Sequence, residues 1–521
     1  MHFPTHEQKQ ALLEPVLRLA DQRLAGEQAN AARGFIADYY HHVDAEDLGS
    51  RNPEDLYGAA MAHLAFARQF SSGTPRIRVY NPRAEEHGWT SPHTVIEIVN
   101  DDMPFLVDSV TIEVNRQGYT LHLLNHPIFA AQRDKEGELQ AYGAPAKDER
   151  SESLIHVEID REIDPARLKE IGAGILGVLA DVRAAVEDWP AMRERLREIV
   201  KEIVDSPPPI DAVEAAEIHA FLEWAGDQHF TFLGYREYVL GTADGEDQLK
   251  IVPRSGLGVL REPRLGGISQ SFTDLPPQLK ALAREPKLLV LTKANTRATV
   301  HRPGYLDYIG VKKFDAAGKV AGERRFVGLY TSSAYHAGPE TIPLLRRKVA
   351  RIVERAGFRP SSHAHKNLLS VLQQYPRDEL FQVDEETLFE TALGVLRLGD
   401  RRRTRVFIRR DVFGRFYSCL IYLPRENYTT DVRMKIQEIL KRHLGGTSAE
   451  FTVQLSDAVL ARIHMLVRTS PRESRRYDVR AIEADLAQAT RRWEDDLKNA
   501  LVEAVGEERS EERRVGKECR L

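Results

Sequence analysis

The sequence predicts a multidomain α+β protein, and three observations support this fold class. The chain has 521 residues, a length that corresponds to about three or four domains of ordinary size. Hydrophobic residues make up 42% and charged residues 29% of the chain, as is usual for globular proteins. Segments with apolar residues at helical spacing are interspersed with segments of alternating β-branched residues, so helices and largely antiparallel strands are both expected.

Charge and cysteine content exclude several protein classes. Lys and Arg number 73 against 78 Asp and Glu, for a net charge of −5, which does not indicate a nucleic-acid or membrane-surface partner. Only Cys419 and Cys519 occur, so neither a disulfide framework nor a cysteine-rich metal site is expected. The first residues lack a signal-peptide pattern, and no apolar run approaches the roughly 20 residues of a membrane span. We therefore expect a cytoplasmic protein.

The N-terminal part is predicted to begin with helices and to continue as a small sheet domain. Residues 6–70 carry apolar side chains at helical spacing. The predicted elements that follow are strands at 76–82 and 93–100, a helix at 104–118 with Pro104 in its first turn, one strand at 120–134, a turn at 134–138, a strand at 152–162 and a helix from 164. The central order of strand, helix, strand, strand and helix is typical of a ferredoxin-like domain with an open-faced sheet.

Three glycines in that last helix match a nucleotide-binding motif. Gly172, Gly174 and Gly177 have the spacing G-x-G-x-x-G, which holds a dinucleotide only where a strand ends and a helix begins. Here Asp164 and Pro165 mark an earlier helix start. One apolar face then continues through the glycines, formed by Leu168, Ile171, Ile175, Leu179, Val182 and Val186. We interpret the glycines as sites of close helix packing, and we expect no cofactor within this chain.

The rest of the chain is predicted to hold a strand-rich block, a helical connector and a second small sandwich. A linker is expected at 191–209, where prolines cluster near its end. The block at 210–358 contains five candidate strands and few helices. Residues 359–401 are predicted to be helical. From 402 to 495 the predicted order is two strands, a helix, two strands and a helix, with the first turn at Phe413-Gly414.

The segment VNDDMPFLVDSV, residues 99–110, is the strongest candidate for a ligand site. Asn100, Asp101 and Asp102 lie between a predicted strand and a predicted helix. These side chains could simply cap the first turn of that helix. Alternatively, the free N–H groups of the helix could receive a carboxylate while a side-chain carboxylate receives an ammonium group. That second arrangement suits a free amino acid, and the residues alone leave both readings open.

Other polar clusters have weaker functional signals. The segment HRPGYLDY, residues 301–308, is interpreted as a turn with exposed polar side chains beside a strand. His363 and His365 lack a further ligand for a metal, and His41-His42 is interpreted as surface histidine. The basic runs at 401–403 and 409–411 are interpreted as solvated strand ends that discourage aggregation. The sequence contains none of the phosphate-loop, zinc-protease, serine-hydrolase or kinase motifs.

Several long segments together resemble a known family. They are VNDDMPFLVDSVTIEVNRQGYTLHLLNHPIF, FLEWAGDQHFTFLGYREY, HRPGYLDYIGVKKFD, RRFVGLYTSSAY, HKNLLSVLQQYPRDELFQ, RTRVFIRRDVFGRFYSCLIYLPRENYTTDVR and ARIHMLVRT. In this order, from about residue 30 to 470, they resemble the N-terminal region of the large bacterial NAD-specific glutamate dehydrogenases.

This resemblance implies a domain organisation. Members of the family carry ACT-type modules, which often bind amino acids, on either side of a PAS-like module. The expected parts are an N-terminal helix (1–33), ACT-type module 1 with a helical lead-in (34–190), the linker (191–209), a PAS-like module (210–358), a helical connector (359–401), ACT-type module 2 (402–495) and a helix end with a non-native tail (496–521). The tail is expected to be non-native because RRVGKECRL breaks the preceding acidic helical pattern.

The resemblance also implies a function. The parent reaction is the oxidative deamination of L-glutamate to 2-oxoglutarate and ammonium with NAD, and family members form homo-oligomers. The chain stops before the expected catalytic domain, so we expect a truncated regulatory part that is inactive alone, with NAD bound outside it. The expected effector site comprises Asn100, Asp101, Asp102, Asp108 and Ser109. A stand-alone amino-acid sensor and an oligomerisation scaffold are the alternatives.

Overall fold

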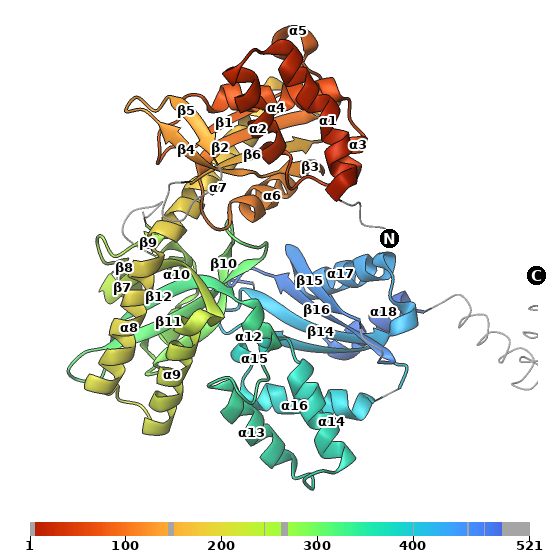
Figure 1. Ribbon diagram of the computed structural model, residues 1–521. Coiled ribbons are helices and arrows are strands. Elements are labelled where there is room, and N and C mark those ends of the chain that lie inside the picture. Colours follow the sequence, from red (N-terminus) through yellow and green to blue (C-terminus); the bar gives the residue numbers. More distant parts are fainter. Residues whose placement is uncertain are drawn as a thin grey trace, which may run out of the picture.

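The computed structural model describes residues 6–143, 151–243, 245–261, 269–399, 401–455, 458–473 and 475–491. Three antiparallel sheets with their helices follow one another along the chain, and a helical connector lies between the second and third (Figure 1). No helix in these described ranges combines the length and apolarity that a bilayer span requires. The expected tail at 496–521 lies outside the described residues.

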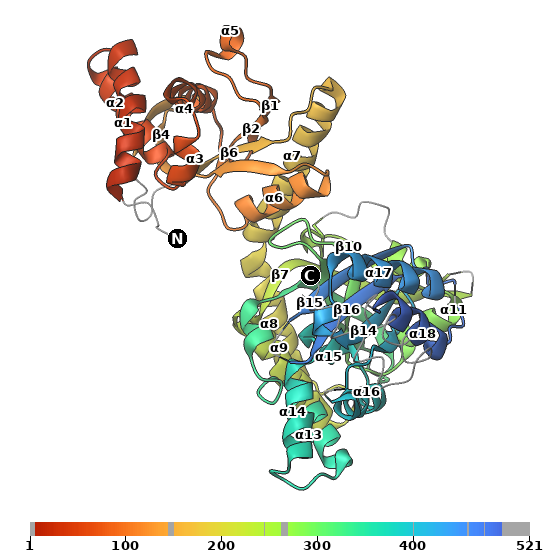
Figure 2. The ribbon, with the colours of Figure 1, turned by 90° about the vertical axis from the view of Figure 1, so that its right-hand side faces the viewer.

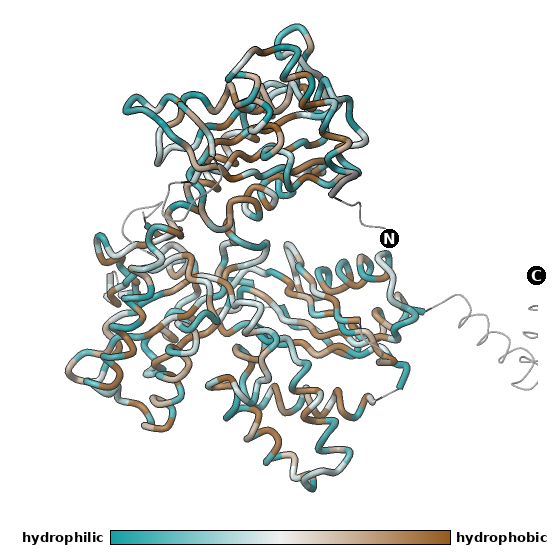
Figure 3. The backbone as a smooth tube through the Cα atoms, viewed as in Figure 1, coloured by the Kyte–Doolittle hydropathy of each residue, from teal (hydrophilic) through white to brown (hydrophobic). Residues whose placement is uncertain are grey.

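The N-terminal region places helices before, within and after its sheet. Its elements are α1 (His6–Arg23), α2 (Glu27–Tyr39), α3 (Ala45–Gly49), α4 (Pro53–Ala67), β1 (Arg76–Tyr80), α5 (Ala84–His87), β2 (Thr94–Asp101), α6 (Leu106–Arg116), β3 (Leu121–Asn125), β4 (Ile128–Arg133), β5 (Leu139–Gly143), β6 (Ser151–Ile159) and α7 (Pro165–Glu187). The sheet order is β1-β2-β6-β4-β5, and β3 pairs with β6 as well. In Figure 3 these strands carry much of the brown colour of apolar residues.

Two element boundaries differ from the prediction. The strand expected at 120–134 is divided into β3 and β4 because Pro127 lacks the N–H group that a continuous ladder needs. Leu121 pairs with Ile159 while Ile128 pairs with Ser153, so both short strands use β6. The helix expected from Pro104 begins at Leu106, because Phe105 has a left-handed backbone with φ of 74°.

Both faces of the first sheet are covered, so the expected open-faced sheet is wrong here. Apolar residues of α1, α2 and α4 pack against Val99, Leu123, Phe129 and Leu154 on one face. Residues of α6 and α7 pack against the opposite face. The segment expected to be a single N-terminal helix at 1–33 contains α1 and the start of α2, and both contribute to this covering layer.

Helix α7 contains the glycine motif, as predicted. Asp164 caps it by accepting a hydrogen bond from the Ala166 N–H, and the helix continues to Glu187. A Cβ atom added to Gly174 would lie 2.1 Å from Oε1 of Glu113 on α6. Gly174 therefore permits close approach of α6 and α7, whereas a Cβ at Gly177 would meet no atom within 4 Å. The glycines do not form a helix N-terminus that could hold a pyrophosphate.

The segment expected to be a linker at 191–209 is mostly helix. Helix α8 spans Trp189–Asp205, and its buried face consists of Met192, Leu196, Ile199 and Ile203. These residues belong to the core of the middle region. The sequence carries this apolar stripe at helical spacing, and the prolines at 207–209 follow the helix as a stop signal rather than marking a longer linker.

The middle region is built around one five-stranded ladder. After α8 it contains α9 (Ala212–Trp224), the π-helical turn η1 (Ala225–His229), β7 (Phe230–Ala243), β8 (Glu246–Ile251), β9 (Leu257–Gly258), α10 (Gln270–Thr273), α11 (Pro277–Lys280), the 3-10 turn η2 (Ala281–Arg284), β10 (Leu289–Arg297), β11 (Tyr305–Phe314), β12 (Val320–Tyr330), α12 (Ser332–His336) and α13 (Leu345–Ala356). The order is β10-β11-β12-β7-β8, and β9 pairs with β7. The predicted strand-rich block is confirmed.

The connector and the C-terminal region follow the predicted order. The connector contains α14 (His363–Gln374), α15 (Arg377–Gln382) and α16 (Glu385–Leu398), and the C-terminal elements are β13 (Arg405–Arg410), β14 (Phe416–Pro424), the 3-10 turn η3 (Arg425–Asn427), α17 (Thr430–Leu444), β15 (Ser448–Gln454), β16 (Leu460–Arg468) and α18 (Val479–Ala489). Apolar residues of the connector share one core with the middle sheet. Figure 2 shows the C-terminal sheet beside the middle region and away from the N-terminal sheet.

The first and third sheets share one topology. The third has the order β13-β14-β16-β15, and the first contains the matching order β1-β2-β6-β3. In each sheet the leading strand pairs with the next one, and a helix connects the second strand with the strand at the other edge. The first sheet differs by the added β4–β5 hairpin. The second small sandwich predicted from the sequence therefore repeats the strand order of the first sheet.

The basic run at 409–411 is not a solvated strand end as we expected. The Arg409 and Glu379 side chains are 9% and 2% exposed, and they form a two-pronged ion pair with N–O distances of 2.5 and 2.7 Å. Asp411 is also buried and accepts hydrogen bonds from Thr292 and Arg415. These contacts fix the C-terminal sheet to the connector and the middle sheet. By contrast, Arg401 to Arg403 are exposed.

A buried polar cluster joins the N-terminal helices to the first sheet. His63 on α4 lies 2.9 Å from the Tyr39 hydroxyl and 3.2 Å from the Ile98 carbonyl oxygen. Glu97 on β2 accepts hydrogen bonds from Arg78 Nε at 3.0 Å and from the Tyr80 hydroxyl at 2.9 Å. Burial lowers the pKa of His63 to about 4, so the imidazole is neutral at pH 7.

The two helical glycines give a matched test of the packing interpretation. Gly177→Ala should raise the free energy of unfolding by about 1 kcal/mol, because alanine favours the helix and meets no neighbouring atom. Gly174→Ala should give no such gain, because its Cβ displaces the Glu113 carboxylate from Arg116 and Gln117. Urea unfolding measures both variants. Equal gains at both positions would contradict the packing role of Gly174.

The neutral His63 should make stability depend on pH. Its pKa lies near 4 in the folded protein against an ordinary 6.5, so the unfolded chain binds the extra proton between these values. The free energy of unfolding should therefore fall as the pH falls from 6.5 to 4, by at most about 1.4 kcal/mol per pH unit from this group. His63→Gln should make this slope shallower, whereas the exposed control His41→Gln should not. Thermal unfolding across this range measures both slopes.

Candidate functional site

The predicted effector residues lie where β2 leads into α6, close to α7. The Asp101 carboxylate accepts hydrogen bonds from the Gly73 N–H at 2.8 Å and from Arg183 Nη2 at 2.7 Å. The same guanidinium donates to Asn100 Oδ1 at 3.1 Å. Burial alone would raise the pKa of Asp101, but the hydrogen bonds from Gly73 and Arg183 lower it. The carboxylate is therefore ionised and pairs with Arg183 on α7.

The acidic residues do not cap α6, so the capping interpretation is wrong. The N-cap is Phe105, which makes no side-chain capping hydrogen bond. The Asp102 carboxylate instead accepts a hydrogen bond from Ser153 Oγ at 2.6 Å, and its backbone N–H donates to Ser151. Asp108 is exposed in the first turn of α6. The side chain of Asp102 thus holds the loop against β6 and does not cap α6.

Ser109 connects this loop to the middle region. The His301 N–H donates to Ser109 Oγ at 3.2 Å, and the rings of Phe105 and His301 lie 4.8 Å apart. Four of the five predicted residues therefore form three separate sets of contacts around one loop, and the exposed Asp108 belongs to none of them. Asn100 and Asp101 meet at Arg183, Asp102 contacts β6, and Ser109 contacts the turn at 298–304.

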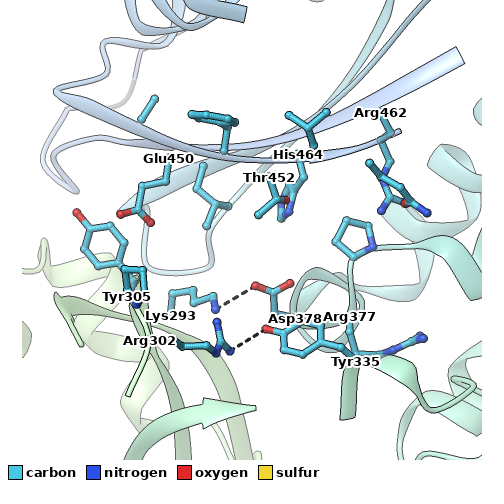
Figure 4. A pocket seen from close by; sticks show the side chains of 18 of the residues that line it. Lys293, Arg302, Tyr305, Tyr335, Arg377, Asp378, Glu450, Thr452, Arg462 and His464 are labelled. Carbon is cyan, nitrogen blue, oxygen red and sulfur yellow. Dashed lines mark hydrogen bonds and ion pairs between the residues drawn. The ribbon is translucent and has the colours of Figure 1, made fainter. Parts of the chain in front are cut away.

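A cavity lies where the middle region, the connector and the C-terminal sheet meet. Its volume is about 650 Å³, within the range of sites for small molecules. The strand β10 and the following turn form one wall, the start of α15 forms a second, and β15 and β16 form the third (Figure 4). We call this space the junction cavity.

An ion-pair cluster forms one side of the junction cavity. Lys293 Nζ lies 2.7 Å from Asp307 and 3.0 Å from Asp378, and all three side chains are largely buried. Burial opposes a charged ammonium group, but Asp307 and Asp378 together raise the pKa of Lys293. The cluster therefore ties β10 and β11 to α15 through a permanently charged lysine.

Three arginines of the cavity donate to neutral acceptors instead of carboxylates. Arg302 donates to the Tyr330 carbonyl oxygen at 3.1 Å and to the Tyr335 hydroxyl at 3.3 Å. Arg462 donates to the Gln374 carbonyl oxygen, and Arg377 donates to that of Ala337. Nε and Nη1 of Arg377 are buried without a hydrogen-bond partner among the described residues. The positive charges of these guanidinium groups are thus not neutralised by a direct ion pair in the described chain.

The sequence alone did not indicate this cavity. The segment at 301–308 was expected to be an exposed polar turn, but Asp307 is buried and Arg302 lines the cavity. A signal was available in β16, where Ala461, Ile463, Met465 and Val467 form an apolar face. Arg462 and His464 alternate with them and so face the opposite side. Polar residues at those positions indicate that the second face of this sheet has its own polar neighbours.

The described residues include one group with metal-ligand geometry. His63, Glu97 and His156 place their ligand atoms within 4.8 Å of one another. The Glu97 carboxylate already pairs with Arg78 and Tyr80, and the positive charge of Arg78 opposes a cation there. We interpret this group as a structural polar cluster. His363 and His365 belong to no such group among the described residues.

Comparison with known proteins places most of these elements in named domains. The family described as "Glutamate dehydrogenase, ACT1 domain" matches residues 35–175, "Glutamate dehydrogenase, helical motif 1" matches 342–401, and "Glutamate dehydrogenase, ACT2 domain" matches 405–494. The ACT1 match includes the predicted effector loop. The junction cavity takes residues from the helical-motif and ACT2 matches and from the region between ACT1 and the helical motif.

Three similar proteins are each named NAD-specific glutamate dehydrogenase. The protein of Halomonas elongata is 41% identical over 98% of this chain and 32% of its own length. That of Pseudomonas aeruginosa is 39% identical over 91% of this chain and 29% of its own length, and that of Mycobacterium tuberculosis is 32% identical over 80% and 25%. The chain thus spans between a quarter and a third of the length of these relatives. It belongs to the NAD-specific glutamate dehydrogenase family, as the part that holds the ACT1 domain, helical motif 1 and the ACT2 domain.

Proposed function

We propose that this chain is the N-terminal regulatory and assembly region of a cytoplasmic, homo-oligomeric NAD-dependent glutamate dehydrogenase. The parent reaction converts L-glutamate, NAD and water to 2-oxoglutarate, ammonium and NADH. The similarity to NAD-specific glutamate dehydrogenases along 98% of the chain carries this proposal. The described residues present the glycine motif inside a helix, and we propose that NAD and the catalytic residues belong to other parts of the enzyme.

The strand orders support a finer description of the domains. We propose that the first and third sheets are ferredoxin-like ACT domains in which the leading strand takes the edge position next to the first core strand. Their matching orders, β1-β2-β6-β3 and β13-β14-β16-β15, support this assignment. For the middle sheet we propose a PAS-like domain, supported by its antiparallel order β8-β7-β12-β11-β10 and by α8, α9 and α13, which pack on the same face of the sheet.

We propose that the loop of the ACT1 domain binds a free amino acid. Arg183 offers a guanidinium group for the ligand carboxylate, and the carboxylates of Asp101 and Asp102 offer partners for its ammonium group. A ligand would exchange the present Asp101–Arg183 contact for contacts of its own. Regulation requires that this binding differ between two arrangements of the enzyme, because only differential affinity shifts an equilibrium.

Calorimetry with a panel of amino acids tests the effector loop. The 521-residue chain should bind at least one amino acid, and Asp102→Ala should weaken that binding about tenfold or more, because it removes a charged partner. Asp102→Asn keeps a hydrogen-bond acceptor for Ser153 and separates loss of charge from loss of the loop contact. The exposed Asp205→Ala is the matched control. Absence of binding by the wild-type chain would refute the effector role and leave the assembly role.

A chimeric enzyme tests the family role of the whole chain. The chain replaces the matching third of the Halomonas elongata relative, with which it shares 41% identity. We expect NADH formation that depends on L-glutamate, because the exchanged region carries the same named domains. The unmodified relative is the control for activity, and light scattering compares the two assemblies. A chimera that folds and assembles like the relative but forms no NADH would contradict the proposal.

A further inference from the structure

We propose that the junction cavity binds a compact organic or inorganic dianion, and that this anion joins the middle region, helical motif 1 and the ACT2 domain. The proposal rests on the charges that line the cavity and does not depend on the glutamate dehydrogenase assignment. It concerns a different site from the ACT1 loop, because the cavity contains none of the five predicted effector residues.

Positive charge exceeds negative charge around the cavity. Five basic side chains line it, and the lining carboxylates are Asp378 and Glu450. Both carboxylates already have cationic partners, since Asp378 pairs with Lys293 and Glu450 pairs with Arg297. With Asp307 beneath Lys293, five cations face three anions. An excess of two positive charges in a partly enclosed space favours a ligand with two negative charges.

The three guanidinium groups without an ion-pair partner in the described residues come from three different parts of the fold. Arg302 follows β10, Arg377 begins α15, and Arg462 belongs to β16. Buried charges normally have an ionic partner, and an unpaired one is costly. Burial lowers the pKa of Arg377 and of Arg462, which is the sign of a charge held without full compensation. The Arg377 nitrogens are themselves enclosed, and Nη2 donates to backbone carbonyl oxygens, so an anion in the cavity would contact Arg302 and Arg462 and supply their missing compensation.

Neutral hydrogen-bond donors complete the lining. Tyr305, Tyr335 and Thr452 have side chains at the cavity. Figure 4 shows Tyr305 and Tyr335 on the side of the middle region and Thr452 on the facing strand. Hydroxyl groups and guanidinium groups together are the usual donors to carboxylate and phosphate oxygens. The shared chemistry is therefore that of a small dicarboxylate or a phosphate group, and the cavity of about 650 Å³ has room for either.

Binding should couple the three parts mechanically. Direct contacts between these parts at the cavity include the Lys293–Asp378 pair, the Arg297–Glu450 pair and the hydrogen bond from Arg462 to the Gln374 carbonyl oxygen. A dianion that contacts Arg302 and Arg462 at once would add a bridge between the middle sheet and the ACT2 sheet. A ligand that binds only the folded, assembled arrangement stabilises it by mass action.

Thermal unfolding and calorimetry with succinate and with inorganic phosphate test this proposal. Sodium chloride at equal ionic strength is the control for salt effects. We expect saturable binding of at least one dianion with a rise in the unfolding temperature of the 521-residue chain. Tighter binding of succinate identifies a dicarboxylate site, and tighter binding of phosphate identifies a phosphate site. Binding of neither above the chloride control would overturn the proposal.

Substitutions locate the binding. Arg302→Gln and Arg462→Gln should each weaken binding about tenfold or more, since each removes one charged donor. Arg302→Lys keeps the charge without the planar fork and should have an intermediate effect. The exposed Arg359→Gln is the matched control and should bind as the wild type does. Circular dichroism checks the fold of each variant. The assignment would be overturned if Arg302→Lys and one correctly folded Gln variant both bound the anion with the wild-type affinity.

Discussion

Helix α7 packs against the first sheet and the middle sheet at the same time, and the arrangement of the N-terminal half depends on this packing. Its apolar face, which includes Ile171, Ile175 and Val182, belongs to one core that also contains residues of the first sheet and of β7, β11 and β12. No flexible linker separates the ACT1 domain from the middle region, because α8 follows α7 directly and packs into the next core. Burial of this shared apolar surface therefore fixes the orientation of the two domains.

Local signals in the sequence predicted the helices and strands better than they predicted which elements pack against each other. Asp164, Pro165 and the apolar spacing identified α7 because caps and periodicity act within a few residues. The ββαββα order of the third sheet was predicted for the same reason. The Arg409–Glu379 pair was missed because the two residues lie on different elements and only tertiary packing brings them together. Arg409 looks like any exposed strand residue until its partner is known, and the same holds for Arg302 and Asp307.

The second face of the ACT2 sheet shows why its polar residues occur where they do. Its first face packs apolar residues of β14 and β16 against α17 and α18. The second face meets the middle sheet and the connector, where Ser418 and His464 hydrogen-bond to each other at 2.9 Å. Burial lowers the pKa of His464 and keeps it neutral. A face that was fully apolar would close against its neighbours, whereas these polar groups leave a cavity between modules that is lined by charge.

The turn at 298–304 connects the ACT1 domain with the junction cavity. The Ala298 N–H donates to the Gly304 carbonyl oxygen at 2.8 Å, so the turn is closed at its base. His301 contacts Ser109 and Phe105 of the ACT1 domain, and the next residue, Arg302, lines the junction cavity. His301 has a left-handed backbone with φ of 79°, which leaves a β-carbon residue little conformational freedom. The closed turn therefore places Arg302 directly after a residue that contacts the ACT1 domain. If the proposed ligands of the junction cavity and of the ACT1 loop influence each other through this turn, thermodynamic reciprocity requires the same factor in both directions.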